Sequence, residues 1–402
     1  MNFIPAKRQL EFMDWEFGVF FHFGIRTFYE GHKDWDFEEM ALSGFNPEKL
    51  DCDSWIKTIK EAGAKYAILV CKHHDGFANW PSEYTEYSVK NTPWKNGGGD
   101  VVREYVDTCR KYDIKVGLYY SPAEFTTEGR AADEYDDYFI NQISELLTGY
   151  GKIDYLWFDG CGSENHEYDT ERIIKEIRRM QPDILIFNMW DPDTRWVGNE
   201  AGVASLDNFN VVENLNISVR TENTEGMGKK RFLPAECDAR MRDFNWFYSD
   251  SDEETVKSPE ELMGLYDLSV GRGANLLLNI GPDRSGLLPE KDCESLLKFA
   301  ENLKKRFSEP LKYTLDKTDK KYTLTLDGDR LAKCVVLKED MSDGQKIRDF
   351  KISLKPRFQG KDIDVYYGKT VGHKVICTFP VACTNEITIE INDGKLSDIS
   401  VF

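Results

Sequence analysis

The sequence of 402 residues lacks three features that would assign a chain to a class at once. It has no run of about 18 uncharged apolar residues, so no membrane-spanning helix is expected. Its nine scattered cysteines are odd in number and include no CxxC pair, so neither a disulfide framework nor a zinc knuckle is indicated. Its 52 basic residues are outnumbered by 71 acidic ones, which argues against nucleic acid or an anionic membrane as a partner.

The first residues also lack the pattern of a secretion signal. The opening segment reads "MNFIPAKRQLEFMDWEFG" and contains no basic stretch followed by a continuous apolar one. Together with cysteines that show no pairing pattern, this predicts a soluble, cytoplasmic protein, unless a signal peptide has been removed ahead of residue 1.

Short apolar segments alternate with amphipathic helical patterns through the first 310 residues. Strands are predicted at 18–24, 64–74, 114–121, 153–160, 183–190 and 275–282, with two more near 203–212 and 231–238. Helices are predicted at 47–63, 100–113, 133–151 and 168–181, from Ser258 with a capping-box spacing, and from Pro289. Seven or eight such units in about 300 residues favour a (β/α)8-like barrel over an open doubly wound sheet.

The last part of the chain has a different pattern. Segments such as "KYTLTLDG", "DFKISLK" and "EITIEI" alternate with period two and are separated by turn residues, which predicts a small antiparallel β-sandwich. Residues 311–402 are also nearly neutral in charge, whereas the first 310 residues are strongly acidic. We therefore expect a barrel domain at 1–310 and a C-terminal β-sandwich at 311–402.

Polar and aromatic side chains lie at the predicted ends of the barrel strands, where barrel enzymes place their chemistry. They are His22, His73, His74, Tyr119, Trp157, Asp159 and Asn188. Such a lining suits a sugar, whose hydroxyls take hydrogen bonds while its C–H faces pack on aromatic rings. Glycoside hydrolysis would add a pair of carboxyl groups to it.

Each of these features also has a simpler interpretation. An aspartate before glycine, such as Asp159, is commonly only a turn residue or a helix cap. "KHHDG" contains metal-ligand types, although consecutive strand residues point to opposite faces, so a metal site would need an irregular strand end. "NGGGD" is either a weak phosphate-binding loop or the cap of the helix that follows it.

Several long motifs, in order from about residue 17 to 308, resemble glycoside hydrolase family 29, the α-L-fucosidases. The motifs include "FGVFFHFGIRTF", "AGAKYAILVCKHHDGFANWPSEYTEYSV", "LWFDG", "RWVGNEAG", "PAECDARMRDFNWFY" and "SVGRGANLLLNIGPDRSGLL". "RWVGNEAG" and "PAECD" further resemble the branch that prefers α-1,3- and α-1,4-linked fucose. The resemblance implies a retaining exo-glycosidase without metal or cofactor, acting on fucosylated oligosaccharides, on a (β/α)8 barrel with a C-terminal β-sandwich.

The resemblance also implies a role for individual residues. Asp159 matches the family nucleophile in "WFDG". The general acid/base is expected to be Glu200 in "RWVGNEAG", with Glu236 in "PAECD" as its rival. The residues expected to contact the sugar are His22, Asp34, Trp35, His73, His74, Tyr119, Trp157, Glu236 and Trp246.

The chain departs from the family pattern in two places. "KDW" has Asp34 before Trp35 where the family usually has Glu, so a hydrogen bond to the sugar is expected to be lost or carried by water. After "LYYSP" the branch usually has Trp and Asp, whereas this chain has Ala123-Glu124-Phe125. Both changes affect substrate contacts and leave Asp159 unchanged.

Three other functions remain open at this stage. One is hydrolysis of a related sugar such as an α-L-galactoside, which differs only by a hydroxyl at C6. Another is a sugar-binding barrel without turnover. The third is a metal-dependent hydrolase that uses His73, His74 and Asp75.

Overall fold

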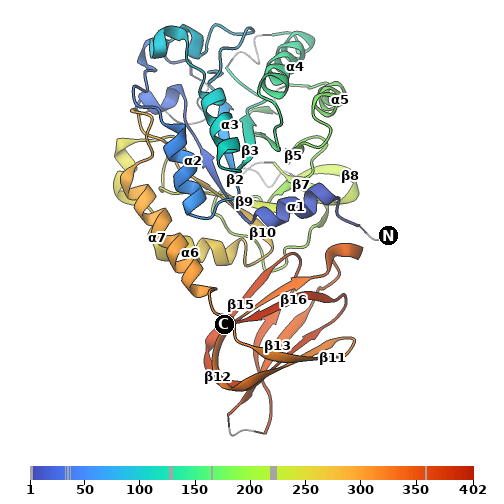
Figure 1. Ribbon diagram of the computed structural model, residues 1–402. Helices are drawn as coiled ribbons and strands as arrows, with labels where there is room; N and C mark the ends of the chain where they lie inside the picture. Colours follow the sequence, from blue (N-terminus) through green and yellow to red (C-terminus); the bar gives the residue numbers. More distant parts are fainter. Residues whose placement is uncertain are drawn as a thin grey trace.

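The computed structural model describes residues 3–31, 33, 36, 38–125, 130–163, 166–217, 224–357 and 360–402. Within these ranges, eight parallel strands form one sheet in the order β5-β4-β3-β2-β1-β10-β9-β6, and a bridge between Phe187 and Thr194 joins its two edges (Figure 1). The strands are β1 (Phe17–Phe21), β2 (Tyr66–Lys72), β3 (Lys115–Tyr120), β4 (Tyr155–Phe158), β5 (Leu185–Phe187), β6 (Arg195–Trp196), β9 (Ala235–Arg240) and β10 (Ala274–Asn279). The barrel expected from the sequence is confirmed.

Six helices of the described chain follow strands of this sheet and cover its outer face. They are α2 (Cys52–Glu61), α3 (Val101–Lys111), α4 (Ala132–Gly149), α5 (Thr170–Met180), α6 (Pro259–Leu268) and α7 (Glu290–Arg306). The capping box at Ser258 and Glu261 is present as predicted. Asp100 caps α3 by accepting the backbone N–H of Arg103, so the "NGGGD" segment ends in the cap of this helix.

The barrel is irregular between β5 and β9. Where the regular pattern would place two helices, the described residues contain β6 and the hairpin of β7 (Val211–Asn216) and β8 (Thr224–Phe232). The strand predicted near 203–212 is therefore wrong as a barrel strand. Its apolar residue Ala204 is buried, but its N–H bonds to the carbonyl of Leu268 at the end of α6. The segment therefore packs against a helix instead of pairing with a strand.

Helix α1 (Lys7–Trp15) closes the N-terminal end of the barrel. Phe12 is fully buried and packs edge-on against Tyr155, at the first residue of β4, with ring centroids 5.3 Å apart. Asn275 near the start of β10 donates to the carbonyl of Phe12 at 2.7 Å. Arg8 pairs with the buried Asp193 at 2.6 Å. Because the described residues fill this end, a site is expected at the C-terminal end of the barrel.

The C-terminal residues form an antiparallel sheet, drawn in orange and red beside α6 and α7 in Figure 1. Its strands are β11 (Tyr313–Lys317), β12 (Lys321–Glu339), β13 (Phe350–Pro356), β14 (Ile363–Gly368), β15 (Val375–Ile391) and β16 (Leu396–Val401). The expected β-domain is therefore present, with its own apolar core.

This sheet contacts the barrel at the end closed by α1. Lys374 pairs with Glu16, the residue before β1, at 2.7 Å. The N–H of Ile376 bonds to the carbonyl of Gly271, shortly before β10. The C-terminal sheet therefore lies away from the open end of the barrel. None of the helices in the described ranges combines the length and apolar character needed to cross a bilayer.

Candidate active site

A cavity of about 260 Å³ opens at the C-terminal end of the barrel strands. It is lined by most of the residues singled out in the sequence: His22, His73, His74, Tyr119, Trp157, Asp159, Asn188, Glu200 and Trp246. These side chains come from nearly every strand end around the barrel, so the fold brings together residues far apart in the chain. Asp34 and Trp35 lie outside the described residues.

Asp159 follows β4 and is half-buried, with both carboxylate oxygens engaged. Oδ2 accepts a hydrogen bond from the Tyr119 hydroxyl at 2.8 Å and lies 3.4 Å from Nε2 of His74. Oδ1 accepts the backbone N–H of Cys161 at 2.9 Å. This last bond forms the turn expected from Asp before Gly, and this simple interpretation of Asp159 is compatible with a functional role.

The surroundings of Asp159 keep it ionised. Burial alone raises the pKa of its carboxyl, but the charge and hydrogen bond of His74, the Cys161 amide and the Tyr119 hydroxyl together lower it below its usual range. For His74, burial lowers the pKa, and Asp159 more than offsets this, so the pKa is raised to about 10. The two side chains therefore face each other at neutral pH as carboxylate and imidazolium.

The proton on Nδ1 of His74 is fixed from the other side of the ring. The Ser121 hydroxyl donates to the carbonyl of Ala123 at 2.6 Å, so its oxygen must accept from Nδ1 of His74, which is also 2.6 Å away. Nδ1 therefore carries a proton, and a second proton at Nε2 points to Asp159.

His22 is held in the opposite charge state. Asn279 donates its amide N–H to the carbonyl of Trp246 at 2.7 Å, so its Oδ1 accepts from Nδ1 of His22 at 2.7 Å. Burial lowers the pKa of His22 to about 3. The ring is neutral, and Nε2 is left as an acceptor for a ligand hydroxyl.

An irregular strand end brings two adjacent histidines into the cavity. The pairing of β2 with β3 shifts register between Val70 and Lys72, directly before His73 and His74. Both rings line the cavity, and the ring of His73 stacks on Tyr119 with centroids 5.5 Å apart. The side chains of His73 and His74 therefore do not point to opposite faces, as consecutive residues of a regular strand would.

Aromatic rings form the floor and one wall of the cavity. Trp157 stacks on Phe187 with centroids 4.2 Å apart and on Tyr119 at 5.4 Å. Trp246 lies 5.0 Å from the His22 ring. Such faces suit the C–H surface of a sugar.

Glu236 lies below this floor and is not part of the cavity lining. It is fully buried and accepts hydrogen bonds from Tyr66 at 2.7 Å, Trp157 at 2.9 Å and Tyr155 at 3.2 Å. Burial raises its pKa to about 7. Direct contact of Glu236 with substrate stays a prediction, and in this geometry its carboxyl lies behind Trp157 and outside the cavity lining.

Two cavity residues on β9, Asp238 and Arg240, were not singled out from the sequence. Arg240 lies 3.7 Å from Glu200 and over the Trp246 ring at 5.2 Å. Asp238 accepts from Nε1 of Trp196 at 2.7 Å. The available signal was the period-two spacing of Glu236, Asp238 and Arg240, which places all three on one face of the strand.

The two departures from the family pattern have different outcomes. Asp34 lies outside the described residues. Glu124 is buried and accepts from Nζ of Lys72 at 2.7 Å and from the Tyr138 hydroxyl at 3.1 Å. It therefore anchors the segment that carries Ser121 and does not line the cavity.

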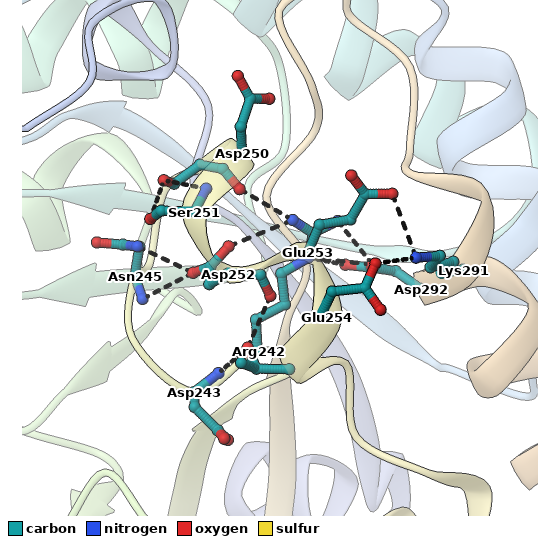
Figure 2. Close-up of polar contacts among 12 residues, drawn as sticks. Arg242, Asp243, Asn245, Asp250, Ser251, Asp252, Glu253, Glu254, Lys291 and Asp292 are labelled. Carbon is teal, nitrogen blue, oxygen red and sulfur yellow. Dashed lines mark hydrogen bonds and ion pairs between the residues drawn. The ribbon is translucent and has the colours of Figure 1, made fainter.

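Figure 2 shows a cluster of ion pairs and hydrogen bonds around Arg242, which holds the loop that follows β9. Arg242 pairs with Asp292 of α7 at 2.9 Å and with Asp252 at 3.3 Å. Asp252 in turn accepts two hydrogen bonds from Asn245, at 3.1 and 2.9 Å. Asn245, the neighbour of Trp246 in sequence, is thus connected through Asp252 and Arg242 to helix α7. These contacts limit the movement of the Trp246 side of the cavity.

His73, His74 and Asp159 form the one group of potential metal ligands found in the described part of the chain. Asp75 is not a member, because its carboxylate pairs with Arg26 at 3.0 Å and accepts the N–H of Phe77 at 2.8 Å. The imidazolium form of His74 has no lone pair to offer a cation. The donor set fits a hydroxylated ligand better than an ion.

Comparison with known proteins matches the chain to one family. The family model described as α-L-fucosidase matches residues 5–306. α-L-Fucosidase 1 of Arabidopsis thaliana is 33% identical over 420 aligned residues, which cover 94% of this chain and 82% of that protein.

Solved structures give the same match. A glycoside hydrolase 29 family member from an unknown rumen bacterium is 30% identical, with a TM-score of 0.90 over 100% of this chain and 77% of that one. A Ruminococcus gnavus family 29 fucosidase in complex with fucose is 26% identical, with a TM-score of 0.86 over 100% and 95% of the two chains.

We predict that His73 and His74 bind ligand hydroxyls and no metal ion. Activity toward an aryl α-L-fucoside should therefore survive exhaustive dialysis against EDTA, and the dialysed protein should contain no stoichiometric zinc by elemental mass spectrometry. A loss of activity that added zinc restores would contradict the prediction.

Proposed function

The chain belongs to the α-L-fucosidases of glycoside hydrolase family 29, and on that basis we propose that it removes terminal α-L-fucose by a retaining mechanism. The observation that carries the proposal is the state of Asp159. It is an ionised carboxylate at a strand end, held by donors on one side and open to the cavity on the other. The fucose bound in the Ruminococcus gnavus relative supports the choice of sugar.

In the first step, a carboxylate oxygen of Asp159 forms a bond to the anomeric carbon while the bond from that carbon to the leaving oxygen breaks. Glu200 gives its proton to the departing oxygen, and the aglycone leaves as an alcohol. The imidazolium of His74 and the hydroxyl of Tyr119 keep the attacking carboxylate ionised and oriented before the reaction.

In the second step, Glu200 acts as a base. It takes a proton from water while the water oxygen attacks the anomeric carbon, and the ester bond to Asp159 breaks. Fucose leaves with its original anomeric configuration, and both carboxyl groups return to their starting protonation states.

Glu200 is preferred to Glu236 as the acid/base because of where the two carboxyls lie. Glu200 lines the cavity, whereas Glu236 is separated from it by the ring of Trp157. A group that protonates a leaving oxygen must come within hydrogen-bond reach of it. We therefore propose that Glu236 positions the Trp157 ring through its hydrogen bond to Nε1.

We further propose a preference for α-1,3- and α-1,4-linked fucose. The support is the resemblance of "RWVGNEAG", which contains Glu200, and of "PAECD", which contains Asp238, to that branch of the family. Both segments contribute side chains to the cavity, which supports a role for them in linkage preference.

The nucleophile is tested by Asp159→Asn, which should lower kcat on an aryl α-L-fucoside by about three orders of magnitude or more, because an amide cannot form the glycosyl ester. Asp183→Asn makes the same chemical change at an exposed position and should behave as wild type. Near-normal turnover in Asp159→Asn would remove Asp159 from this role.

The acid/base is tested by the leaving group. Protonation matters most for a sugar alcohol and little for an activated phenol, so Glu200→Ala should nearly abolish cleavage of a natural glycan and spare attack on an activated aryl fucoside. Its glycosyl-enzyme should break down slowly, and azide should speed the breakdown because a small anion needs no general base.

Glu236→Ala is the matched comparison and should lower activity on both substrates by similar factors, as loss of a positioning group does. If the leaving-group dependence and the azide rescue occur in Glu236→Ala and are absent from Glu200→Ala, the two roles must be exchanged.

The substrate is tested with four compounds under one set of conditions: an aryl α-L-fucoside, an aryl α-L-galactoside, a Lewis-type trisaccharide and an α-1,2-linked fucoside. We expect kcat/KM for the Lewis-type sugar to exceed that for the α-1,2 linkage by about tenfold or more, since one or two contacts can supply this ratio. If none of the four compounds is cleaved, the proposed function is refuted. If the aryl galactoside is cleaved faster than the aryl fucoside, the substrate must be reassigned from α-L-fucose to α-L-galactose.

A further inference from the structure

Strand β9 carries three ionisable side chains on the face that points into the barrel. Glu236, Asp238 and Arg240 alternate along it, and their surroundings change with depth. Glu236 is fully buried, Asp238 is 5% exposed and lines the cavity, and Arg240 lies at the mouth beside Glu200. Asp238 is therefore a third carboxyl group, after Asp159 and Glu200, that a sugar in the cavity would meet.

Asp238 has one side-chain hydrogen-bond donor and no cation. Nε1 of Trp196 donates to Oδ1 at 2.7 Å, which leaves Oδ2 for the cavity. No Lys, Arg or His of the described residues comes within ion-pair distance of it. The guanidinium of Arg240, two residues along the same face, is directed to Glu200 and over the ring of Trp246.

The other groups around Asp238 do not favour a negative charge. Glu200, on the loop after β6, and Glu236, on β9 itself, are both acidic. On β10, the neighbouring residue is Leu277, and the nearest polar side chains of that strand, Asn275 and Asn279, are neutral amides. Arg195 of β6 bonds to Asn208 on the outer side of the barrel.

An ionised carboxylate at the position of Asp238 would be unfavourable in free energy. Removing a charge from water costs several kcal/mol unless a cation or several donors compensate it. Burial is the main cause that raises the pKa of Asp238 well above its usual range, and the negative charge of Glu200 adds to it. The hydrogen bonds from Trp196 and from the backbone amide of Asp238 itself oppose the rise without cancelling it. Asp159 is the contrasting case, because His74 and two further donors hold it ionised.

We propose that Asp238 binds the substrate as a neutral carboxylic acid, whose Oδ2 hydroxyl donates a hydrogen bond to an oxygen of the sugar held at Asp159. Oδ1 keeps the bond from Trp196, and the proton stays on Asp238 throughout the reaction. This role rests on the proposed function and adds a binding residue to it. The three carboxyl groups of the cavity then differ in task because their surroundings differ.

Two substitutions separate a neutral acid from a carboxylate. In Asp238→Asn the amide oxygen can still accept from Trp196 while the amide N–H donates to the sugar, so fucose affinity by titration calorimetry should stay within about threefold of wild type. In Asp238→Ala the donor is lost and Trp196 is left without its partner, which should weaken binding by about tenfold. Equal damage in both variants would overturn the proposal, provided that both unfold at the wild-type temperature.

Protonation can be observed directly and without activity. Infrared spectra of the full chain near neutral pH should show a protonated-carboxyl band that Asp238→Asn removes. Glu236→Gln is the matched control, because it removes the other buried carboxyl of β9 and should leave that band in place. Absence of any band sensitive to Asp238→Asn would overturn the proposal even in a fully active fucosidase. Its presence in a protein that cleaves no fucoside would instead refute only the enzymatic reaction.

Discussion

An ionised carboxylate can stay half-buried at the end of β4 only because three donors face it. The imidazolium of His74, the hydroxyl of Tyr119 and the amide of Cys161 come from β2, β3 and the turn after β4. The relative register of these three neighbouring strands therefore sets the charge on Asp159. A shift of one residue in β2 that brought Asp75 to the place of His74 would replace the imidazolium by a second carboxyl group and leave Asp159 without its main counter-charge.

The walls of the cavity depend on buried ion pairs as much as on apolar packing. Lys72 and Glu124 hold the segment that carries Ser121, which fixes the proton on Nδ1 of His74. Arg242 pairs with Asp292 and Asp252 and in this way holds the loop that carries Trp246. Such pairs are weak evidence for stability, but they define one arrangement, because a displaced partner would leave an uncompensated charge behind. They suit a site whose parts must meet within a few tenths of an ångström.

Much of this site could be predicted from the sequence because strand ends carry their own signal. The apolar run before Asp159 and the one before His73 and His74 marked both positions, and the fold places them together. The prediction failed where the signal depends on register. A strand expected at 231–238 put Glu236 near its end, whereas β9 begins at Ala235 and makes Glu236 its second residue, deep in the barrel. The same offset concealed Asp238. β6 has two residues and offers no periodicity to detect.

Helix α1 has a consequence for how the chain is made. It leaves the ribosome before any strand of the barrel, yet the partners of Phe12 belong to β2, β4 and β10. β1 likewise needs β10 beside it, more than 250 residues later, before the sheet can close. The aromatic face of α1 thus stays without its native cover while most of the barrel is still being synthesised. Contacts so distant in sequence form late, and nascent chains of this topology expose apolar surface for as long as elongation lasts.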